Sequence, residues 1–229
     1  RLSATVSRNG DLITNMWLEV DLTGATSPTY AVGHELIEYV ELEIGGQRID
    51  KHYGEWLEIL SELTVPEEKQ PAYRQMVGKN LNSTGTDAQV QGTNTPKLYI
   101  PLQFFFCRNP GLALPLIALQ YHEVKINIEL RPMDECLFAV TKVDTSGTAS
   151  VKTTNSYAKS LVAASLYVDY VFLDTDERRR MAQNPHEYLI EQLQFTGDES
   201  VGSSSNKIKL NFNHPCKELI WVVQPDENV

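Results

Sequence analysis

The sequence predicts an all-β fold, an antiparallel β-sandwich of jelly-roll type with short helices in its connections. Three observations support this prediction. Segments in which apolar and polar residues alternate recur along the chain, helical periodicity is confined to short pieces, and two long polar stretches interrupt the strand patterns. Many strands joined by long loops, with few helices, are typical of a β-sandwich or jelly roll.

Alternating strands make up the first part of this pattern. Within residues 121–130, Val124, Ile126, Ile128 and Leu130 alternate with polar residues, and similar alternation runs through residues 12–20 and 36–44. A period of two places one face of each strand on the core and the other in water. The dipeptides Gly45-Gly46 and Gly10-Asp11 are expected to form hairpin turns rather than phosphate-binding loops.

Other strand-like runs lack this alternation or come late in the chain. Residues 98–106 and 161–173 are apolar on both faces, which predicts strands that are covered on both sides. After Pro185 a new series begins, with strand-like runs expected at residues 188–195, 207–212 and 218–223. This series indicates the beginning of a second β-domain.

Helical patterns are short. Residues 53–64 carry one apolar stripe at helical spacing, formed by Trp56, Ile59, Leu60 and Leu63. Pro66 is well placed to open a second short helix. Residues 174–180 place acidic side chains before basic ones, which complements the dipole of a short helix.

Two polar stretches, residues 78–96 and 141–159, are predicted to be loops. Loops of this length in a compact domain are usually functional or mobile. The first contains the tripeptide Asn82-Ser83-Thr84, so Asn82 is a candidate glycosylation site.

Charge and composition exclude several classes of protein. The chain has 229 residues and a formal net charge of −10, which argues against a nucleic-acid coat and against a polybasic membrane binder. No apolar run reaches the roughly 18–20 residues that span a bilayer. The first residues do not resemble a secretory signal, and both ends are expected to be cuts through a longer protein.

Metal and redox sites are not predicted. The cysteines Cys107, Cys136 and Cys216 are far apart, so free thiols explain them better than a disulfide, zinc or redox site. Five histidines are also scattered, and no H-x-H pair is present. They are His34, His52, His122, His186 and His214. We therefore expect no metal and no cofactor.

No catalytic residues are assigned either. Glu35, Glu41 and Glu43 are expected to share one strand face, and a solvated surface explains them more simply than a glycosidase or calcium site. Arg178, Arg179 and Arg180 stand beside acidic residues, which favours a salt-bridged helix over a nucleic-acid site. Since nucleophile and nucleotide motifs are missing, the residues favour a binding or structural role over catalysis.

Several segments resemble signatures of the major capsid proteins of large nucleocytoplasmic DNA viruses. Residues 44–56 (IGGQRIDKHYGEW) and 106–124 (FCRNPGLALPLIALQYHEV) carry the most specific resemblance. Residues 173–180 and 186–192 resemble the junction after the family's first jelly roll, and residues 3–12 resemble the stretch after its first strand. The resemblance is nearest to the iridovirus, marseillevirus and chlorovirus branch.

The resemblance implies a tandem double jelly roll. Residues 1–184 would form the first jelly roll, without its N-terminal arm and first strand, and residues 185–229 the truncated start of the second. Within residues 106–124, Asn109-Pro110-Gly111 and Leu114-Pro115 would fix the path of the chain by their turn chemistry. The two polar loops would face outward, and residues 53–77 would contribute to trimer contacts.

The resemblance also implies partners. Three copies would form a pseudo-hexagonal homotrimeric capsomer that contacts neighbouring capsomers and minor capsid proteins in an icosahedral virion shell. The shell would be assembled late in infection in the host cytoplasm, around an internal membrane that the protein does not span. Because that membrane would separate shell from genome, the protein would not contact nucleic acid, which agrees with its acidic charge.

A different function remains open from the residues alone. The chain could be a carbohydrate-binding β-sandwich in which Trp17, Trp56 or Trp221 serves as a platform for a sugar ring. Core packing is the simpler explanation for Trp56, which lies on the helical stripe.

Overall fold

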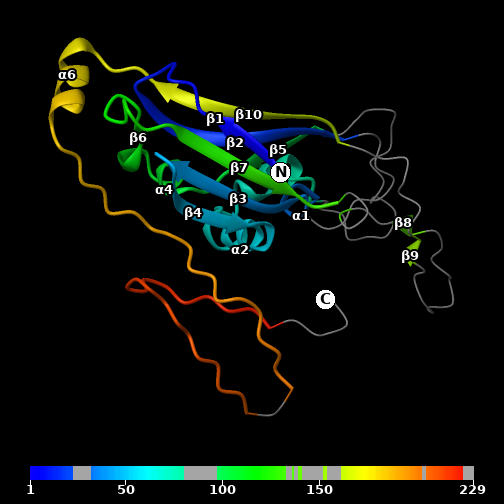
Figure 1. Cartoon of the computed structure of the whole chain (residues 1–229). Coiled ribbons are helices and arrows are strands. Elements are labelled where there is room, and N and C mark those ends of the chain that lie inside the picture. Colours follow the sequence, from blue (N-terminus) through cyan, green and yellow to red (C-terminus); the bar gives the residue numbers. More distant parts are fainter. Residues whose placement is uncertain are drawn as a thin grey trace. The chain divides into compact units, whose positions relative to one another are not determined.

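The computed structural model describes residues 1–22, 32–79, 97–132, 136, 139–140, 152–153, 161–202 and 205–223. The chain divides into two compact units, Arg1–Gln192 and Leu193–Val229, which are treated separately (Figure 1). Every described helix and strand belongs to the first unit. None of the described helices combines the length and the apolar character needed to cross a membrane.

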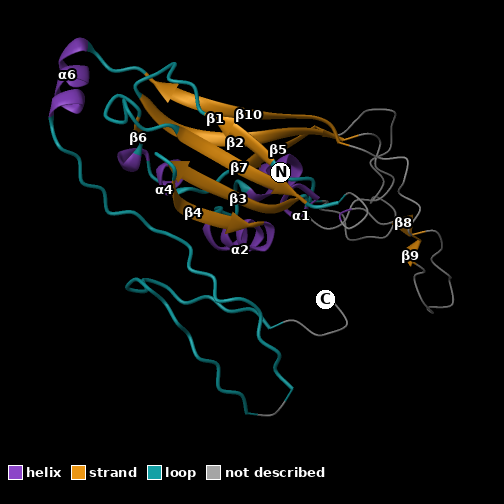
Figure 2. Cartoon of the chain, in the orientation of Figure 1, coloured by secondary structure: helices purple, strands orange, loops and turns teal. Residues whose placement is uncertain are grey.

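Two antiparallel sheets form the first unit (Figure 2). The sheet that we call the β3 sheet has the order β1 (Leu2–Thr5), β7 (Val124–Leu130), β3 (Ile37–Ile44) and β4 (Gln47–Tyr53). The sheet that we call the β2 sheet has the order β10 (Leu161–Val171), β2 (Leu12–Leu22) and β5 (Lys97–Pro101), and β6 (Leu114–Pro115) pairs with the start of β2. The predicted all-β class is therefore confirmed.

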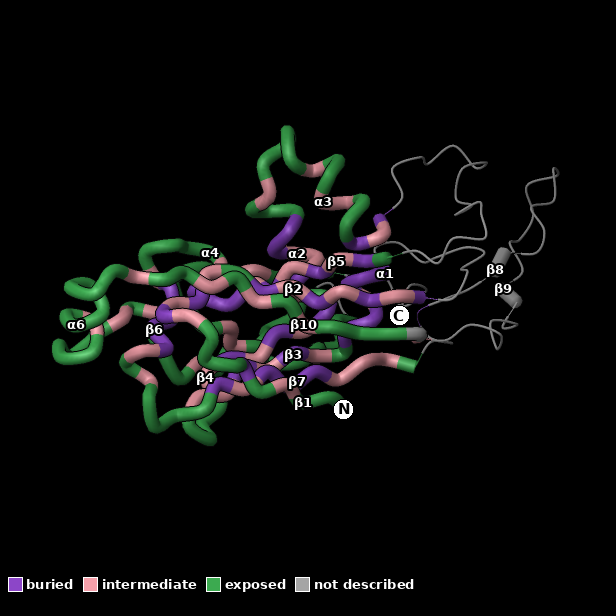
Figure 3. The backbone as a smooth tube through the Cα atoms, turned by 90° about the horizontal axis from the view of Figure 1, so that it is seen from above, coloured by how far each residue is buried: buried purple, intermediate pink, exposed green. Residues whose placement is uncertain are grey.

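The core lies between these sheets, because alternate residues of both turn inward. Met16 and Leu18 of β2, Val40 of β3 and Ile126 of β7 belong to one buried cluster (Figure 3). Burying a side chain of this size contributes about 1.5–3 kcal/mol, so the shared core is the main source of stability.

Short helices fill the connections. They are α1 (Val32–Glu35), α2 (Gly54–Thr64), α3 (Gln70–Met76), α4 (Phe105–Arg108), the 3₁₀ helix η1 (Pro110–Leu112) and α6 (Thr175–Gln183). A small separate ladder pairs β8 (Ala139–Val140) with β9 (Lys152–Thr153), so the predicted loop 141–159 contains part of a strand pair. The rest of this loop, and residues 80–96 of the other, lie outside the described residues.

Of the two predicted hairpin turns, one is confirmed. Gly45 and Gly46 join β3 to β4 with φ angles of 60° and 83°, as a two-residue turn of the primed type requires. The prediction for Gly10-Asp11 was wrong, because the strands before and after it, β1 and β2, belong to different sheets. Gly10 instead passes close to Tyr170, whose Cβ would be 2.5 Å from an added Cβ.

The alternation in β2 is interrupted by a bulge. Met16 pairs with Val168 and Ile13 with Tyr170, so two residues of β2 lie opposite Asp169 alone. This extra residue shifts the inward face, and Ile13 is buried where simple alternation predicted Leu12.

Two of the predicted helices differ in detail. In α2 the buried residues are Gly54, Leu57, Leu60 and Ser61, so the buried face is rotated from the predicted stripe and Leu63 is exposed. Gly54 begins this helix against α1, where an added Cβ would lie 2.3 Å from the His34 carbonyl oxygen. The second helix begins at Gln70 instead of Pro66, because Pro66–Lys69 form a turn first.

The prediction that residues 98–106 form one strand was wrong beyond Pro101. The chain leaves β5 there, and Phe104, Phe105 and Phe106 are buried around the start of α4. Three consecutive aromatic residues can all be buried at a bend, whereas a strand would alternate them between two faces.

The prediction that β10 is covered on both faces was also wrong. Leu166, Val168 and Tyr170 pack against the core, but the opposite face of this edge strand is exposed (Figure 3). Tyr167 on that face is 45% exposed.

The described residues after α6 form no strand, so the strands predicted at 188–195, 207–212 and 218–223 are not formed. A strand exists only with a hydrogen-bonded neighbour, and the described part of this segment contains no ladder. Apolar side chains of Leu193–Val229 such as Ile208, Leu210 and Trp221 are consequently exposed.

Residues 184–192 run instead along the first unit. The Tyr188 hydroxyl donates to the Ala113 carbonyl over 3.1 Å, and Arg108 pairs with Glu191 at 3.1 Å. The Gln192 side-chain amide donates to the carbonyl of Ile49 in β4. These contacts attach the segment after α6 to the first sandwich.

Candidate functional site

The histidines do not converge. Among the described residues no group of three or more His, Cys, Asp or Glu side chains could hold a metal ion. His122, His186 and His214 are exposed, whereas His34 and His52 are buried in different places.

His52 belongs to a buried pair in β4. Its Nε2 lies 2.9 Å from Oδ2 of Asp50, two residues earlier on the same inward face. The imidazole stacks on Phe104 with ring centroids 4.9 Å apart. The stacking on Phe104 links β4 to the residues after β5. Because the core encloses the imidazole ring, a substrate has no access to it.

His34 belongs to a second buried cluster, which joins α1, α2 and α3. Its Nδ1 lies 2.6 Å from Oε2 of Glu58 and its Nε2 lies 3.0 Å from the Tyr73 hydroxyl. Lys79, also buried, donates to Glu58 over 2.5 Å and to Glu62. These pairs hold together the three short helices at one end of the sandwich.

The pKa values of this cluster follow from its burial and its hydrogen bonds. Burial alone would raise the pKa of Glu58, but hydrogen bonds from His34 and Lys79 together bring this pKa below its ordinary value. Burial, with the Glu58 charge nearby, raises the pKa of Tyr73 to about 12. Glu58 is thus held as a carboxylate and Tyr73 as a neutral phenol, which is an arrangement that stabilises structure.

The three predicted surface carboxylates are divided between two places. Glu41 lies on the outer face of β3, with Arg1, Arg48 and Lys51 between 3.6 and 3.8 Å away. Glu35 does not share that face, because it lies in α1 and pairs with Arg131 at 2.9 Å. The arrangement therefore gives a solvated ion-pair surface on β3 and no pair of carboxylates across a cleft.

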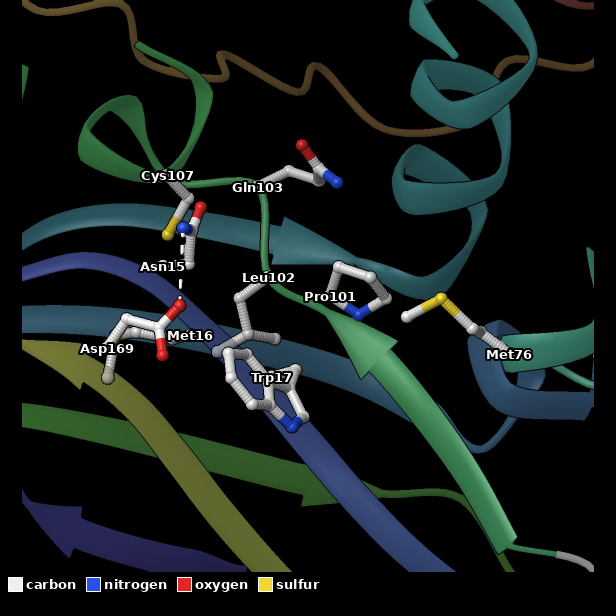
Figure 4. Close-up of a pocket in the computed structure, with 9 residues that line it drawn as sticks. All are labelled: Asn15, Met16, Trp17, Met76, Pro101, Leu102, Gln103, Cys107 and Asp169. Carbon is white, nitrogen blue, oxygen red and sulfur yellow. Dashed lines mark hydrogen bonds between the residues drawn. The ribbon is translucent and has the colours of Figure 1, made fainter. Parts of the chain in front are cut away.

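A shallow pocket lies at the bulge of the β2 sheet (Figure 4). It measures about 240 Å³ and is lined by Asn15, Met16, Trp17, Met76, Pro101, Leu102, Gln103, Cys107 and Asp169. Asn15 donates to Asp169 over 3.4 Å. Burial raises the pKa of Cys107 to about 12, so its thiol is not a nucleophile at neutral pH.

A second pocket of about 450 Å³ lies beside α4 and includes Cys107, Arg108 and Glu191 among its lining residues. The ion pair between Arg108 and Glu191 crosses this region. Cys107, Cys136 and Cys216 form no disulfide bond with one another.

The tryptophans differ in their surroundings. Trp17 stacks on Tyr167 with ring centroids 5.9 Å apart and planes within 5°. Trp56 is half-buried on α2, and Trp221 is exposed in the second unit. Within the first unit, Trp17 lies on β2 and is already stacked, whereas Trp56 lies on α2.

The predicted turn chemistry is confirmed at Asn109-Pro110-Gly111, whereas Leu114-Pro115 form the short strand β6 instead. The Asn109 side chain accepts a hydrogen bond from the Gly111 amide at 2.9 Å, which caps η1. Pro115 in β6 pairs with Leu12 of β2. These residues turn the chain from α4 to β7, so this segment determines the fold.

The predicted basic run lies on α6. Asp174 caps this helix by accepting from the Glu177 amide at 2.8 Å, and Arg178 pairs with Asp11 at 3.0 Å. The prediction of a salt-bridged helix is confirmed. Asn82 lies outside the described residues, and its glycosylation stays a prediction.

Comparison with known proteins identifies the family to which the chain belongs. The family described as "Major capsid protein N-terminus" matches residues 1–174, and the family described as "Large eukaryotic DNA virus major capsid protein" matches residues 177–229. The chain is 56% identical to the major capsid protein of Phaeocystis pouchetii virus over 100% of its length and 49% of the relative's. It is 46% identical to that of Paramecium bursaria Chlorella virus 1, over 96% of the chain and 48% of the relative.

Solved structures of viral capsid proteins resemble the fold of this chain. A quasi-atomic model of the PBCV-1 virus capsid superposes with a TM-score of 0.70 at 43% identity, over 93% of this chain and 49% of the other. The Faustovirus major capsid protein, at 13% identity and a TM-score of 0.55, supports the fold alone.

The chain spans about half the length of the relatives described above. The sandwich, the capped turn after α4 and the α6 junction all lie within the matched residues. The chain belongs to the family of major capsid proteins of large eukaryotic DNA viruses.

Proposed function

We propose that the chain is part of a capsid subunit that assembles as a homotrimeric, pseudo-hexagonal capsomer and tiles an icosahedral shell. Its role is structural and not enzymatic. The observation that carries the proposal is the match of two successive capsid-protein families to one chain, with the second match beginning within α6.

The arrangement of domains is part of the proposal. Residues 1–184 form the first jelly roll, and residues 185–229 begin a second, which the remainder of a longer protein completes. The exposed apolar side chains of Leu193–Val229 support this arrangement, because residues such as Trp221, 76% exposed, need a covering surface. Such a subunit contacts its own copies, neighbouring capsomers and minor capsid proteins.

The acidic charge supports a place in the shell away from the genome. With a net charge of −10, the chain is poorly suited to neutralise phosphates. In the proposed virion an internal membrane lies between shell and nucleic acid, and the subunit does not span it. Assembly takes place in the host cytoplasm.

Light scattering coupled to size-exclusion chromatography of the full-length protein tests the proposal. The expected result is a stable species of three times the monomer mass that forms hexagonal particles in electron micrographs. A monomer at all concentrations that is retained on a glycan column would contradict it and favour the carbohydrate-binding alternative.

A further inference from the structure

The outer face of the β2 sheet carries an aromatic row. Trp17 of β2 lies opposite Tyr167 of β10 on one side and Pro101 of β5 on the other. Towards one end of the sheet, Glu19 lies opposite Tyr99, and towards the other, beyond the bulge, Leu12 lies opposite Val171. Figure 4 shows Trp17 and Pro101 beside the shallow pocket. We call this set of residues the aromatic face.

The outer face of β10 combines Tyr167 and Val171 with the polar residues Ser165 and Asp169, and it is exposed. Tyr167 is 45% exposed and Phe172, just after the strand, is 71% exposed. Aromatic residues are enriched where proteins meet. The aromatic face therefore has the composition of a contact surface.

The charges on this face define the partner. Lys97 lies 3.0 Å from Glu19 and 3.6 Å from Asp21, so these acids already have a cation. Asp169, beside Tyr167 in β10, is exposed and contacts the neutral amide of Asn15 at 3.4 Å. A partner that supplies a guanidinium group would both pair with Asp169 and stack on an aromatic ring.

The chain contains one run of three consecutive basic residues, on α6. Arg179 is 62% exposed. The helix is held just past the end of β10, because Asp11 accepts from the Leu173 amide at 2.8 Å and pairs with Arg178 at 3.0 Å. Arg179 lies 3.5 Å from Asp176 one turn earlier on the same helix, but both side chains of this pair are largely exposed. Because such exposed pairs contribute little, Arg179 can exchange Asp176 for a carboxylate of another molecule.

We propose that the aromatic face receives helix α6 of a second copy of this chain, with Arg179 of the second copy against Asp169 and Tyr167. This inference rests on the proposed trimer and names the two surfaces that meet in it. The two surfaces differ from each other, so the contact is heterologous, and a heterologous contact with a threefold rotation closes into a ring of three copies.

A charge exchange in the full-length protein tests this contact. Asp169→Arg and Arg179→Glu are each expected to raise the trimer dissociation constant by about tenfold or more, and the double variant to restore most of the lost affinity. Arg48→Glu is the matched control, because Arg48 is 65% exposed and lies on the β3 sheet. Tyr167→Ser is expected to weaken the trimer as well, whereas Tyr121→Ser, at an exposed tyrosine outside the sheet, should not.

The outcomes separate this inference from the proposed function. Trimers unchanged by every variant would overturn the contact and leave the capsid assignment intact, whereas a monomeric wild type would overturn both. If the variants lower the unfolding midpoint but leave the trimer unchanged, another part of the same polypeptide covers the aromatic face, and the inference is wrong. Single variants that weaken the trimer without rescue in the double variant would exclude α6 as the partner.

Discussion

The two sheets of the sandwich share one core but have different outer faces. On the β3 sheet, Glu41 lies among Arg1, Arg48 and Lys51, and the Lys51 ammonium lies 3.8 Å from the centre of the Tyr39 ring. On the β2 sheet the corresponding position is occupied by the stacked rings of Trp17 and Tyr167.

The difference indicates different surroundings in the assembled protein. Ion pairs and lysines over tyrosines suit a face that stays in water, since charged groups are costly to desolvate. Stacked aromatic rings suit a face that another protein covers, and on this face Lys97 already pairs with Glu19 and Asp21. One sandwich can therefore expose one outer face to solvent and use the other outer face as a contact surface, with a single core between them.

The largest effect is expected from a residue that joins the two sheets. Phe104 follows β5, is fully buried and stacks on His52 of β4. Phe104→Ala should lower the free energy of unfolding by about 3–5 kcal/mol, because it removes a large side chain from a closed core. Urea denaturation measures this loss. Tyr121→Ala, at a tyrosine that is 94% exposed, is the control and should change the stability by less than about 0.5 kcal/mol.

A smaller effect is expected from the buried cluster at the helical end. Glu58→Gln should cost about 1–3 kcal/mol at neutral pH, because Lys79 and His34 lose a charged partner. The pKa of Glu58 is lower in the folded chain than its ordinary value of 4.5, so its stabilising effect is present above that value. The advantage of the wild type should shrink as the pH falls through the lowered pKa.

Unfolding midpoints measured from neutral to acidic pH test this dependence. Glu67→Gln, at an exposed acid in the turn before α3, is the matched control and should show almost no difference at any pH. An advantage of the wild type over Glu58→Gln that persists unchanged in acid would contradict the assigned role of Glu58.

The smallest effect is expected on the solvated face. Glu41→Gln should cost less than about 1 kcal/mol, because surface ion pairs contribute little. The cost should fall further in salt of about 1 M, where charges are screened over a few ångströms. The Glu41→Gln variant should also leave the trimer dissociation constant unchanged, whereas variants of the aromatic face should raise it. A trimer that depends on Glu41 would remove the contrast between the two faces.

Much of the fold was predictable because local chemistry determined it. The Gly45-Gly46 hairpin, the buried Val124, Ile126 and Ile128 of β7 and the Asp174 cap of α6 each follow from the residues in a short window. Asn127, expected on the wet face of β7, is nevertheless buried. The bulge opposite Asp169 was not predictable, because it depends on how β2 pairs with β10, which is far away in the sequence. The buried face of α2 likewise depends on the close approach of α1 at Gly54.

The functional surface was harder to predict than the fold. The apolar pattern of residues 161–173 predicted a strand covered on both faces, but the described chain covers only one face of β10. Sequence alone could not separate a face covered within the chain from a face left for a partner. The strands predicted after Pro185 failed for a related reason, since strand formation needs a neighbouring strand that the described residues do not supply.

Hydroxyl-radical footprinting of the isolated subunit and of the assembled capsomer tests the central claim most directly. The aromatic face should become protected on assembly, so oxidation of Trp17, Tyr99 and Tyr167 should fall several-fold. Tyr39 on the solvated face should be oxidised equally in both states. Equal oxidation of Trp17 and Tyr167 in the subunit and the capsomer would contradict the account.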